Sequence, residues 1–114
     1  MIDVPGVDST MIANNSSPAQ TTHPGEIILD EITHLGISQK EFAERIGTSR
    51  SLVSQVLTGK RAVSTEFALL TEAAIDIPAD LLLRMQARYD RWKVEKEPAF
   101  MERLKKIQKF AAVL

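Results

Sequence analysis

Residues 38–58 (SQKEFAERIGTSRSLVSQVLT) constrain the fold most, because they carry start and stop signals for two short helices in succession. Ser38 and Glu41 have the spacing of a capping box, which predicts that a helix begins at Gln39. Gly47 suits the left-handed backbone conformation that ends a helix, since it has no Cβ. The segment therefore predicts two helices joined by a turn of a few residues.

The apolar residues of this segment follow the period of a helix. Thr48 or Ser49 can cap the second helix. Counted from Gln39, the fifth position is the small Ala43, where a larger side chain would hold two crossing helices apart. The fourth, eighth, fifteenth and eighteenth positions are apolar, and they are Phe42, Ile46, Val53 and Val56. This pattern is typical of a helix-turn-helix.

The outward face of the predicted second helix is polar, as a helix needs if it lies in a major groove and contacts base edges. We expect Arg50 to be the main base contact, with bidentate hydrogen bonds to guanine, and Gln39 to bind a phosphate or support a base contact. Thr58, Lys60 and Arg61 would bind the phosphate backbone. The predicted DNA-binding residues are Gln39, Ser49, Arg50, Ser51, Ser54, Gln55, Thr58, Lys60 and Arg61. The alternative is a solvated surface helix of an ordinary helical hairpin.

The composition fits one small domain with an aliphatic core. The chain has 114 residues, of which 44% are hydrophobic and 5% aromatic. It has no cysteine, which excludes disulfides, thiolate metal sites and cysteine nucleophiles. No apolar run is long enough to span a membrane, and the first 22 residues lack the basic start of a secretory signal. We expect a cytoplasmic protein with no membrane partner.

The net charge of −1 hides an uneven distribution. Residues 1–35 carry five acids and no Lys or Arg, whereas residues 36–63 carry five bases and two acids. Residues 64–80 carry four acids and no base, and residues 81–114 carry nine bases and four acids. Positive charge therefore lies on the helix-turn-helix and on the C-terminal third, and phosphate binding depends on this local field.

Outside the helix-turn-helix, the sequence pattern predicts helices and no strand. Residues 1–22 lack periodicity and predict a disordered N-terminal tail, in which Met11 is a second candidate initiator. A helix begins at Pro24, after His23 or Thr22, and ends near Leu35. It is expected to bury Ile28, Ile32 and Leu35.

Three further helices follow the helix-turn-helix. Ser64 caps the first, which is apolar nearly all round and is expected at the centre of a bundle. Pro78 opens the second, with Leu81, Met85, Tyr89 and Trp92 on one face. Pro98 starts the last, with Phe100, Leu104, Ile107, Ala111 and Leu114 on a stripe. The chain is thus predicted to be all-α, with a DNA-binding domain over 23–93 and a C-terminal amphipathic helix over 94–114.

Three segments resemble those of a known family in order and spacing. Residues 23–31 (HPGEIILDE), 57–70 (LTGKRAVSTEFALL) and 81–90 (LLLRMQARYD) are similar to the opening, the Gly-Lys-Arg loop and the Leu-Asn-Leu-Gln-Ala-Arg-Tyr-Asp segment of HigA-type antitoxins. These belong to the lambda-repressor-like (XRE) helix-turn-helix proteins. The resemblance covers roughly residues 22–92. It implies a five-helix DNA-binding domain. The N-terminal tail and the last helix, from Pro98, lie outside the resemblance.

The same resemblance implies a function. HigA-type antitoxins form homodimers, bind double-stranded operator DNA, repress their own operon and neutralise a RelE-like ribonuclease toxin. The chain departs from the family at Ile77, at Leu81–Leu82 and at Arg84, close to or on a helix that family members commonly use for dimer contacts. The acidic tail over residues 1–22 would be a toxin-binding segment or, alternatively, the result of a misplaced start site.

The remaining polar residues do not form a recognisable catalytic or metal-binding pattern. His23 and His34 lie eleven positions apart, without the carboxylate spacing of a metal site, and are expected at a helix start and on the surface. No nucleophile triad or phosphate-binding glycine loop is present. We therefore expect no enzyme activity, no cofactor and no metal.

Two basic stretches leave alternatives open. Arg84, Arg88 and Arg91 form a stripe that we expect opposite the apolar face of their helix, either simply solvated or in contact with DNA or an acidic partner. The last helix combines four bases with an apolar stripe, which favours an oligomer or toxin contact over a membrane surface. An XRE-type phage or host regulator without a toxin is the alternative function, and an interaction module that has lost DNA binding is a third.

Overall fold

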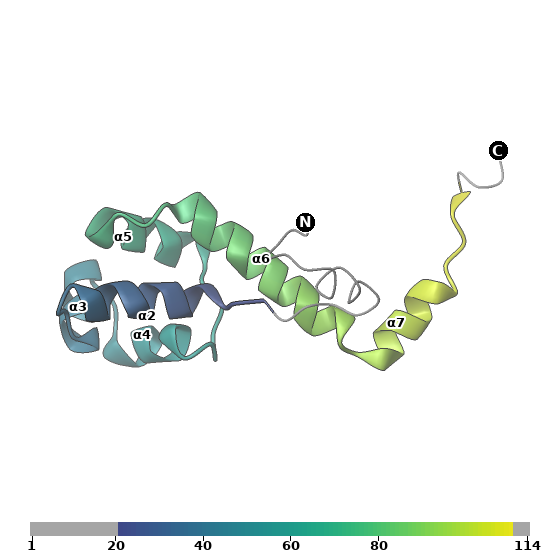
Figure 1. Cartoon of the computed structure of the whole chain (residues 1–114), viewed down its shortest axis with the longest axis horizontal. Helices are drawn as coiled ribbons and strands as arrows, with labels where there is room; N and C mark the ends of the chain where they lie inside the picture. The colour runs from purple at the N-terminus through teal and green to yellow at the C-terminus, as the bar shows by residue number, and fades with distance from the viewer. Residues whose placement is uncertain (1–20, 111–114) are drawn as a thin grey trace, which may run out of the picture. The chain divides into compact units, whose positions relative to one another are not determined.

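The computed structural model describes residues 21–110, and these residues contain six α-helices and no strand. The helices are α2 (Pro24–His34), α3 (Gln39–Ile46), α4 (Arg50–Leu57), α5 (Thr65–Ile75), α6 (Ala79–Glu95) and α7 (Pro98–Lys105) (Figure 1). The all-α prediction of five helices with an additional C-terminal helix is confirmed. The predicted disordered tail lies outside the described residues, apart from Thr21 and Thr22.

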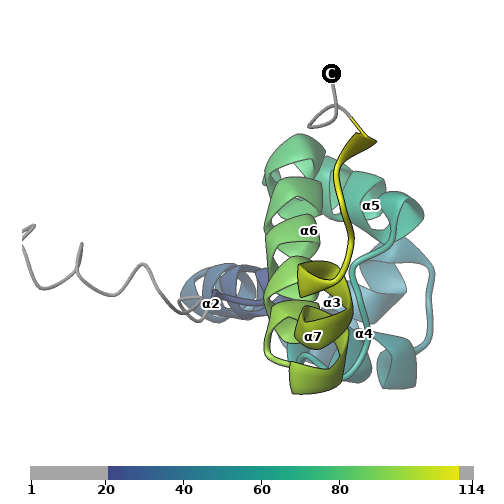
Figure 2. The same cartoon turned by 90° about the vertical axis from the view of Figure 1, so that its right-hand side faces the viewer.

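The chain divides into two compact units. Residues 21–89 contain α2 to α5 and most of α6, and the described part of the other unit is residues 90–110, with the end of α6 and all of α7. In the first unit, α2 packs on α4 and α5, and α3 packs on the same two helices. A short turn leads from α5 into α6 (Figures 1 and 2).

The core of the first unit is aliphatic, with two phenylalanines in an edge-to-face contact at 6.3 Å, Phe42 and Phe67. The apolar positions predicted for the helix-turn-helix are all buried, and so is Ala43. The buried apolar residues are Ile28, Ile32, Phe42, Ala43, Ile46, Val53, Val56, Leu57, Val63, Phe67, Ala68, Ile77, Ala79 and Leu82. Burial of these side chains supplies the main stabilisation of the unit.

Two expectations about burial in α2 and α5 are wrong. Leu35 is exposed, because the helix ends at His34 and Leu35 is its C-cap, pointing away from the core. Leu69 and Leu70 are also exposed, since α5 packs on α2 and α3 with one side only, which buries Phe67, Ala68 and Thr71. The α5 helix is therefore not central to the bundle.

The predicted position of the basic stripe on α6 is wrong. The helix buries Ala79, Leu82 and Gln86, and the predicted face of Leu81, Met85, Tyr89 and Trp92 is half-buried. Leu81 and Met85 line a surface hollow with Arg84 and Arg88, so the basic stripe lies beside these apolar residues and not opposite them. Contacts distant in sequence decide which side of the helix is buried, such as the hydrogen bond from the Val63 N–H to Gln86.

The last helix is shorter than the predicted range of 94–114. The α6 helix ends at Glu95, and α7 ends at Lys105. Ile107 therefore lies beyond the helix, and the expected stripe is limited to Phe100 and Leu104. Ala111 and Leu114 lie outside the described residues.

Candidate nucleic-acid interface

A sharp turn joins α3 to α4 and sets the position of α4. The Ser38 hydroxyl accepts the Glu41 backbone N–H at 3.0 Å, and the Glu41 carboxylate accepts the Ser38 N–H at 2.9 Å. Gly47 ends α3 with φ 74°, a conformation that costs little only for glycine. The Thr48 N–H then donates to the Ala43 carbonyl at 3.0 Å. The predicted capping box and glycine stop are both confirmed.

The capping box also lowers the pKa of the Glu41 carboxyl group below its ordinary value of 4.5. The bond from the Ser38 backbone N–H is the main cause, and the Ser38 side chain is the second. The carboxylate thus remains ionised at the start of α3, where negative charge also interacts favourably with the helix dipole.

The outward face of α4 is polar and carries no acid. Ser49 caps the helix, with its hydroxyl accepting the Leu52 N–H at 3.0 Å. Arg50 and Ser51 are exposed at the first turn. Ser54 and Gln55 are half-buried on the next turn. This face therefore offers hydrogen-bonding groups without a carboxylate that would repel phosphate.

Arg50 is available for an external ligand. It is the first residue of α4, and within residues 21–110 its guanidinium makes no hydrogen bond or ion pair. Gln39 has the same place in α3, as the first helical residue, and is half-buried. The two side chains lie at the N-terminal ends of the two helices, where backbone N–H groups also favour an anion.

The C-terminal end of α4 is closed by side-chain bonds. The Thr58 hydroxyl donates to the Ser54 carbonyl at 2.8 Å. The Arg61 Nε donates to the Gln55 Oε1 at 2.9 Å, so the loop arginine lies against the exposed face of the helix. The sequence did not predict this pair, because the two residues lie in different elements. It orients the Gln55 amide, whose nitrogen is left to donate outward.

The loop after α4 is held by a contact with the core, through a residue that was not predicted to belong to the site. The buried Gln86 of α6 accepts the Val63 N–H at 2.8 Å. The only signal in the sequence is a polar residue one turn after Leu82. The loop that carries Lys60 and Arg61 is thus attached to the core at its end, which limits the positions that their charges can take.

His23 supports the same loop. Its Nδ1 accepts the Gly25 N–H at 2.9 Å, which confirms its predicted place at the helix start. Its buried ring contacts Tyr89 edge-on at 4.8 Å and lies next to Gly59, whose φ is 81°. A Cβ on Gly25 would lie 2.1 Å from the Val56 carbonyl oxygen, so α2 and the end of α4 are in direct backbone contact.

The dimensions of α4 match a major groove. The helix has eight residues, so it is about 12 Å long, close to the width of the groove. Arg50 lies at one end, and exposed Lys60 and Arg61 follow the other. Positive charge thus lies at both ends of a polar face, an arrangement that suits phosphate contacts on either side of a groove.

The comparisons with known proteins agree with this geometry. The sequence matches the helix-turn-helix family over residues 30–82. The uncharacterized HTH-type transcriptional regulator YbaQ of Escherichia coli (strain K12) is 33% identical over 94 residues, which cover 82% of this chain and 83% of YbaQ. The chain belongs to the XRE helix-turn-helix family. All nine predicted DNA-binding residues lie inside the matched XRE domain.

Solved structures share the fold of this XRE protein. A candidate antidote protein of a plasmid maintenance system from Nostoc punctiforme is 26% identical, covers 79% of this chain and is itself covered completely, with a TM-score of 0.66. The Pseudomonas aeruginosa antitoxin HigA, solved with the higBA promoter, has a TM-score of 0.71 at 22% identity; the match covers 80% of this chain and 99% of HigA. HigA-type antitoxins are thus structural neighbours of this XRE domain.

Other kinds of site are not evident in the described part of this XRE protein. Between residues 21 and 110, no three His, Asp or Glu side chains are grouped so that they could hold a metal ion. None of the six described helices is long and apolar enough to cross a membrane. His34 is exposed, as predicted.

Proposed function

We propose that this protein is a dimeric antitoxin that binds a specific operator, represses its own operon and neutralises a RelE-like ribonuclease toxin in the cytoplasm. The observation that carries the proposal is the polar, acid-free face of α4 with arginine and lysine at its two ends. Such a face suits base contacts in the middle and phosphate contacts at the ends.

Each residue of the interface has a separate role in this proposal. Arg50 makes the main base contact, and Ser51, Ser54 and Gln55 make secondary ones. Ser49 and Thr58 hold their helix ends by hydrogen bonds and can still face the DNA backbone. The residues that bind phosphate are Gln39, Ser49, Thr58, Lys60 and Arg61.

The antitoxin part of the proposal is supported by the resemblance of three segments to HigA-type antitoxins and by the solved relatives. The Nostoc protein, at 26% identity, is a candidate antidote protein of a plasmid maintenance system. A toxin-free regulator is the second candidate, and it is favoured by the 33% identity to YbaQ, a transcriptional regulator.

Two measurements test the proposal. A gel shift with DNA from upstream of the protein's own gene should give a complex that random DNA of equal length does not displace. Expression of this protein should then restore the growth of cells that express the product of the adjacent gene, and the two proteins should copurify. A specific gel shift without rescue would favour the toxin-free regulator, and the absence of any shift would overturn the assignment to operator binding.

A further inference from the structure

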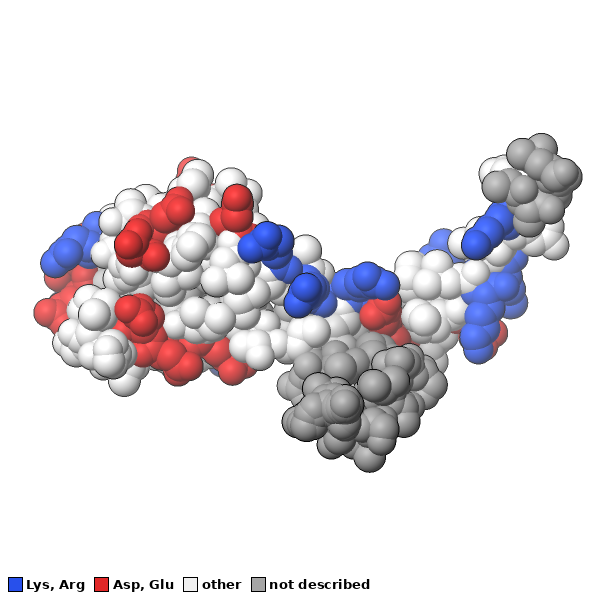
Figure 3. All heavy atoms as spheres, turned by 45° about the horizontal axis from the view of Figure 1, so that its top comes forward, with Lys and Arg blue, Asp and Glu red and all other residues white. Residues whose placement is uncertain are grey.

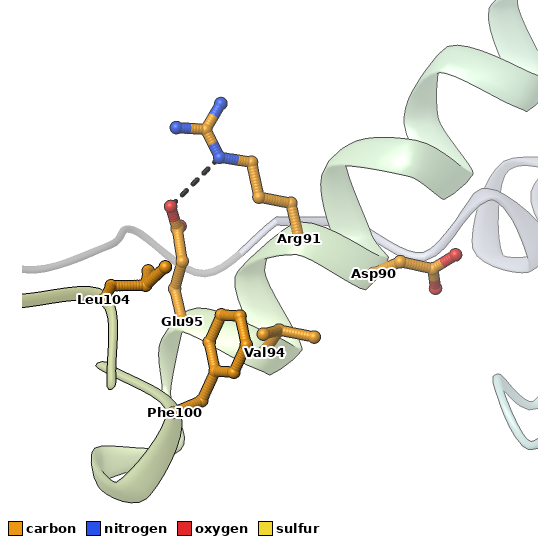
Figure 4. Close-up of a pocket in the computed structure, with 6 residues that line it drawn as sticks. All are labelled: Asp90, Arg91, Val94, Glu95, Phe100 and Leu104. Atoms are coloured by element: carbon orange, nitrogen blue, oxygen red, sulfur yellow. Dashed lines mark hydrogen bonds and ion pairs between the residues drawn. The ribbon is translucent and has the colours of Figure 1, made fainter. Parts of the chain in front are cut away.

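An apolar groove lies in the 90–110 unit, outside the part of the chain that matches the helix-turn-helix family. Its apolar walls are Val94 of α6 and Phe100 and Leu104 of α7 (Figure 4). Val94 is 40% exposed and Leu104 is 42% exposed, although each lies next to other apolar side chains. The groove has a volume of about 490 Å³, enough for more than one large side chain.

The polar residues of this groove are mostly acidic. Asp90 and Glu95 belong to its lining, together with Arg91. The Arg91 Nε donates to Glu95 at 2.9 Å, an ion pair along one side of the groove (Figure 4). The groove thus combines an apolar floor with two carboxylates, of which Glu95 is paired with Arg91.

The segment after α7 has the opposite character. Lys106 is the C-cap of α7, and residues 106–110 (KIQKF) lead away from the end of the helix (Figure 1). Phe110 is 92% exposed and Ile107 is 67% exposed. Lys106 and Lys109 accompany them, and the segment has no acid. Figure 3 shows lysine and arginine side chains gathered on α7 and the residues after it.

We propose that residues 106–110 of one copy occupy the groove of a second copy, with Phe110 and Ile107 on Val94, Phe100 and Leu104. The lysines would then lie near Asp90 and Glu95 of the other copy, so charge and apolar surface are both complementary. Within one copy the segment leaves Phe110 exposed, whereas an exchange between two copies buries both segments and both grooves. Such an exchange is two-fold symmetric and closes after two copies.

This inference adds to the proposed homodimer by naming the residues that hold it together. It does not depend on DNA binding, because the groove and the segment both lie outside the helix-turn-helix. Dimerisation through other surfaces would leave the proposed function intact and this inference wrong.

Cysteine cross-linking tests the exchange directly, since the chain has no cysteine of its own. Full-length Val94→Cys and Phe110→Cys proteins carry tags of different size and are co-expressed, then oxidised. The expected product is a disulfide between the two differently tagged chains, because a side chain seated in the groove brings the two Cα atoms within about 7 Å. The matched control pairs Phe110→Cys with Leu69→Cys, a site on α5 that is more exposed than Val94.

A second measurement avoids engineered thiols. Phe110→Glu should raise the dimer dissociation constant about tenfold or more in sedimentation equilibrium, with an unchanged circular dichroism melt of the folded unit. Leu69→Glu should leave the dimer unchanged. Equal cross-linking of both cysteine pairs, or a wild-type dimer in Phe110→Glu, would overturn the inference. If the mixed disulfide forms but no operator is bound, the exchange stands and the proposed function fails.

Discussion

Arg50 and Lys60 differ in their attachment to the fold, and this difference separates their expected roles. Arg50 begins a helix that Ser49 caps by accepting the Leu52 N–H at 3.0 Å, so its backbone is fixed within the fold. Lys60 lies in the loop after Gly59, although its N–H is tied to the Gln55 carbonyl at 2.9 Å. A base contact requires the fixed geometry, whereas a phosphate contact tolerates small changes of position.

We predict that Arg50→Ala costs about 1–3 kcal/mol of binding free energy at one base position and relaxes discrimination there. Lys60→Ala should weaken binding to all sequences evenly and reduce the slope of log K against log salt by about one. Fluorescence anisotropy with a panel of single-base operator variants at several salt concentrations measures both. Equal losses of affinity for specific and random DNA in the two variants would contradict the division of roles.

Gly25 is a second residue at which the geometry predicts the effect of a substitution on stability. A methyl group there would lie 2.1 Å from the Val56 carbonyl oxygen, and backbone cannot move away cheaply. We predict that Gly25→Ala lowers the free energy of unfolding by about 1–3 kcal/mol. It should also weaken operator binding, because the displaced carbonyl belongs to α4.

Chemical denaturation and anisotropy measure the two effects of Gly25→Ala. Thr33→Ala, at an exposed and uncharged position near the end of α2, is the matched control and should change neither value appreciably. A Gly25→Ala protein with wild-type stability would show that α2 and α4 can separate without cost.

At the scale of elements, α3 depends on its capping box more than on its length. It has only eight residues, too few for an isolated helix to be stable in water. The reciprocal bonds between Ser38 and Glu41 satisfy two backbone N–H groups at its start. Because α3 packs on both α4 and α5, its first turn affects the position of the outward face of α4.

The capping box predicts that the free energy of unfolding depends on pH. The pKa of Glu41 is lower in the folded state than its ordinary value of 4.5, so its contribution to stability is present above that value. The contribution is lost as the pH falls through the lowered pKa. Glu41→Gln should therefore flatten the dependence of the unfolding free energy on pH below 4.5.

Urea denaturation at a series of pH values provides the measurement. Ser38→Ala should flatten the curve only in part, since it keeps the backbone N–H that is the main cause of the shift. An unchanged slope in Glu41→Gln would show that the carboxylate is not bound in solution.

At the scale of the whole molecule, one helix-turn-helix presents a single helix of eight residues to DNA. That surface is small for a specific complex, and a two-fold dimer doubles it. The dimer proposed above uses α6 and α7, and the groove of the 90–110 unit gives α7 a defined contact.

We predict that the operator is a pseudo-palindrome whose half-sites lie about 34 Å apart, or a multiple of that distance. Footprinting of the upstream DNA and sedimentation of the free protein measure the spacing and the oligomeric state. A monomer at tens of micromolar with a footprint over one asymmetric half-site would refute the two-fold arrangement.

The sequence by itself determined the helix-turn-helix and the exposed face of α4. Caps such as Ser38, Ser49 and Ser64 act over three residues, and the left-handed Gly47 acts on its own turn, so their effects can be derived locally. The period of Val53 and Val56 likewise follows from one helix. The outward face of α4 was therefore predictable before any tertiary contact was known.

Only the tertiary structure decided the features that join distant residues. The buried side of α6, with Leu82 and Gln86, depends on how that helix lies on the rest of the core. The bond from Val63 to Gln86 spans 23 positions, and no local pattern signals it. Propensity and capping act within one or two turns, whereas the choice between two half-apolar faces depends on side chains supplied by other helices.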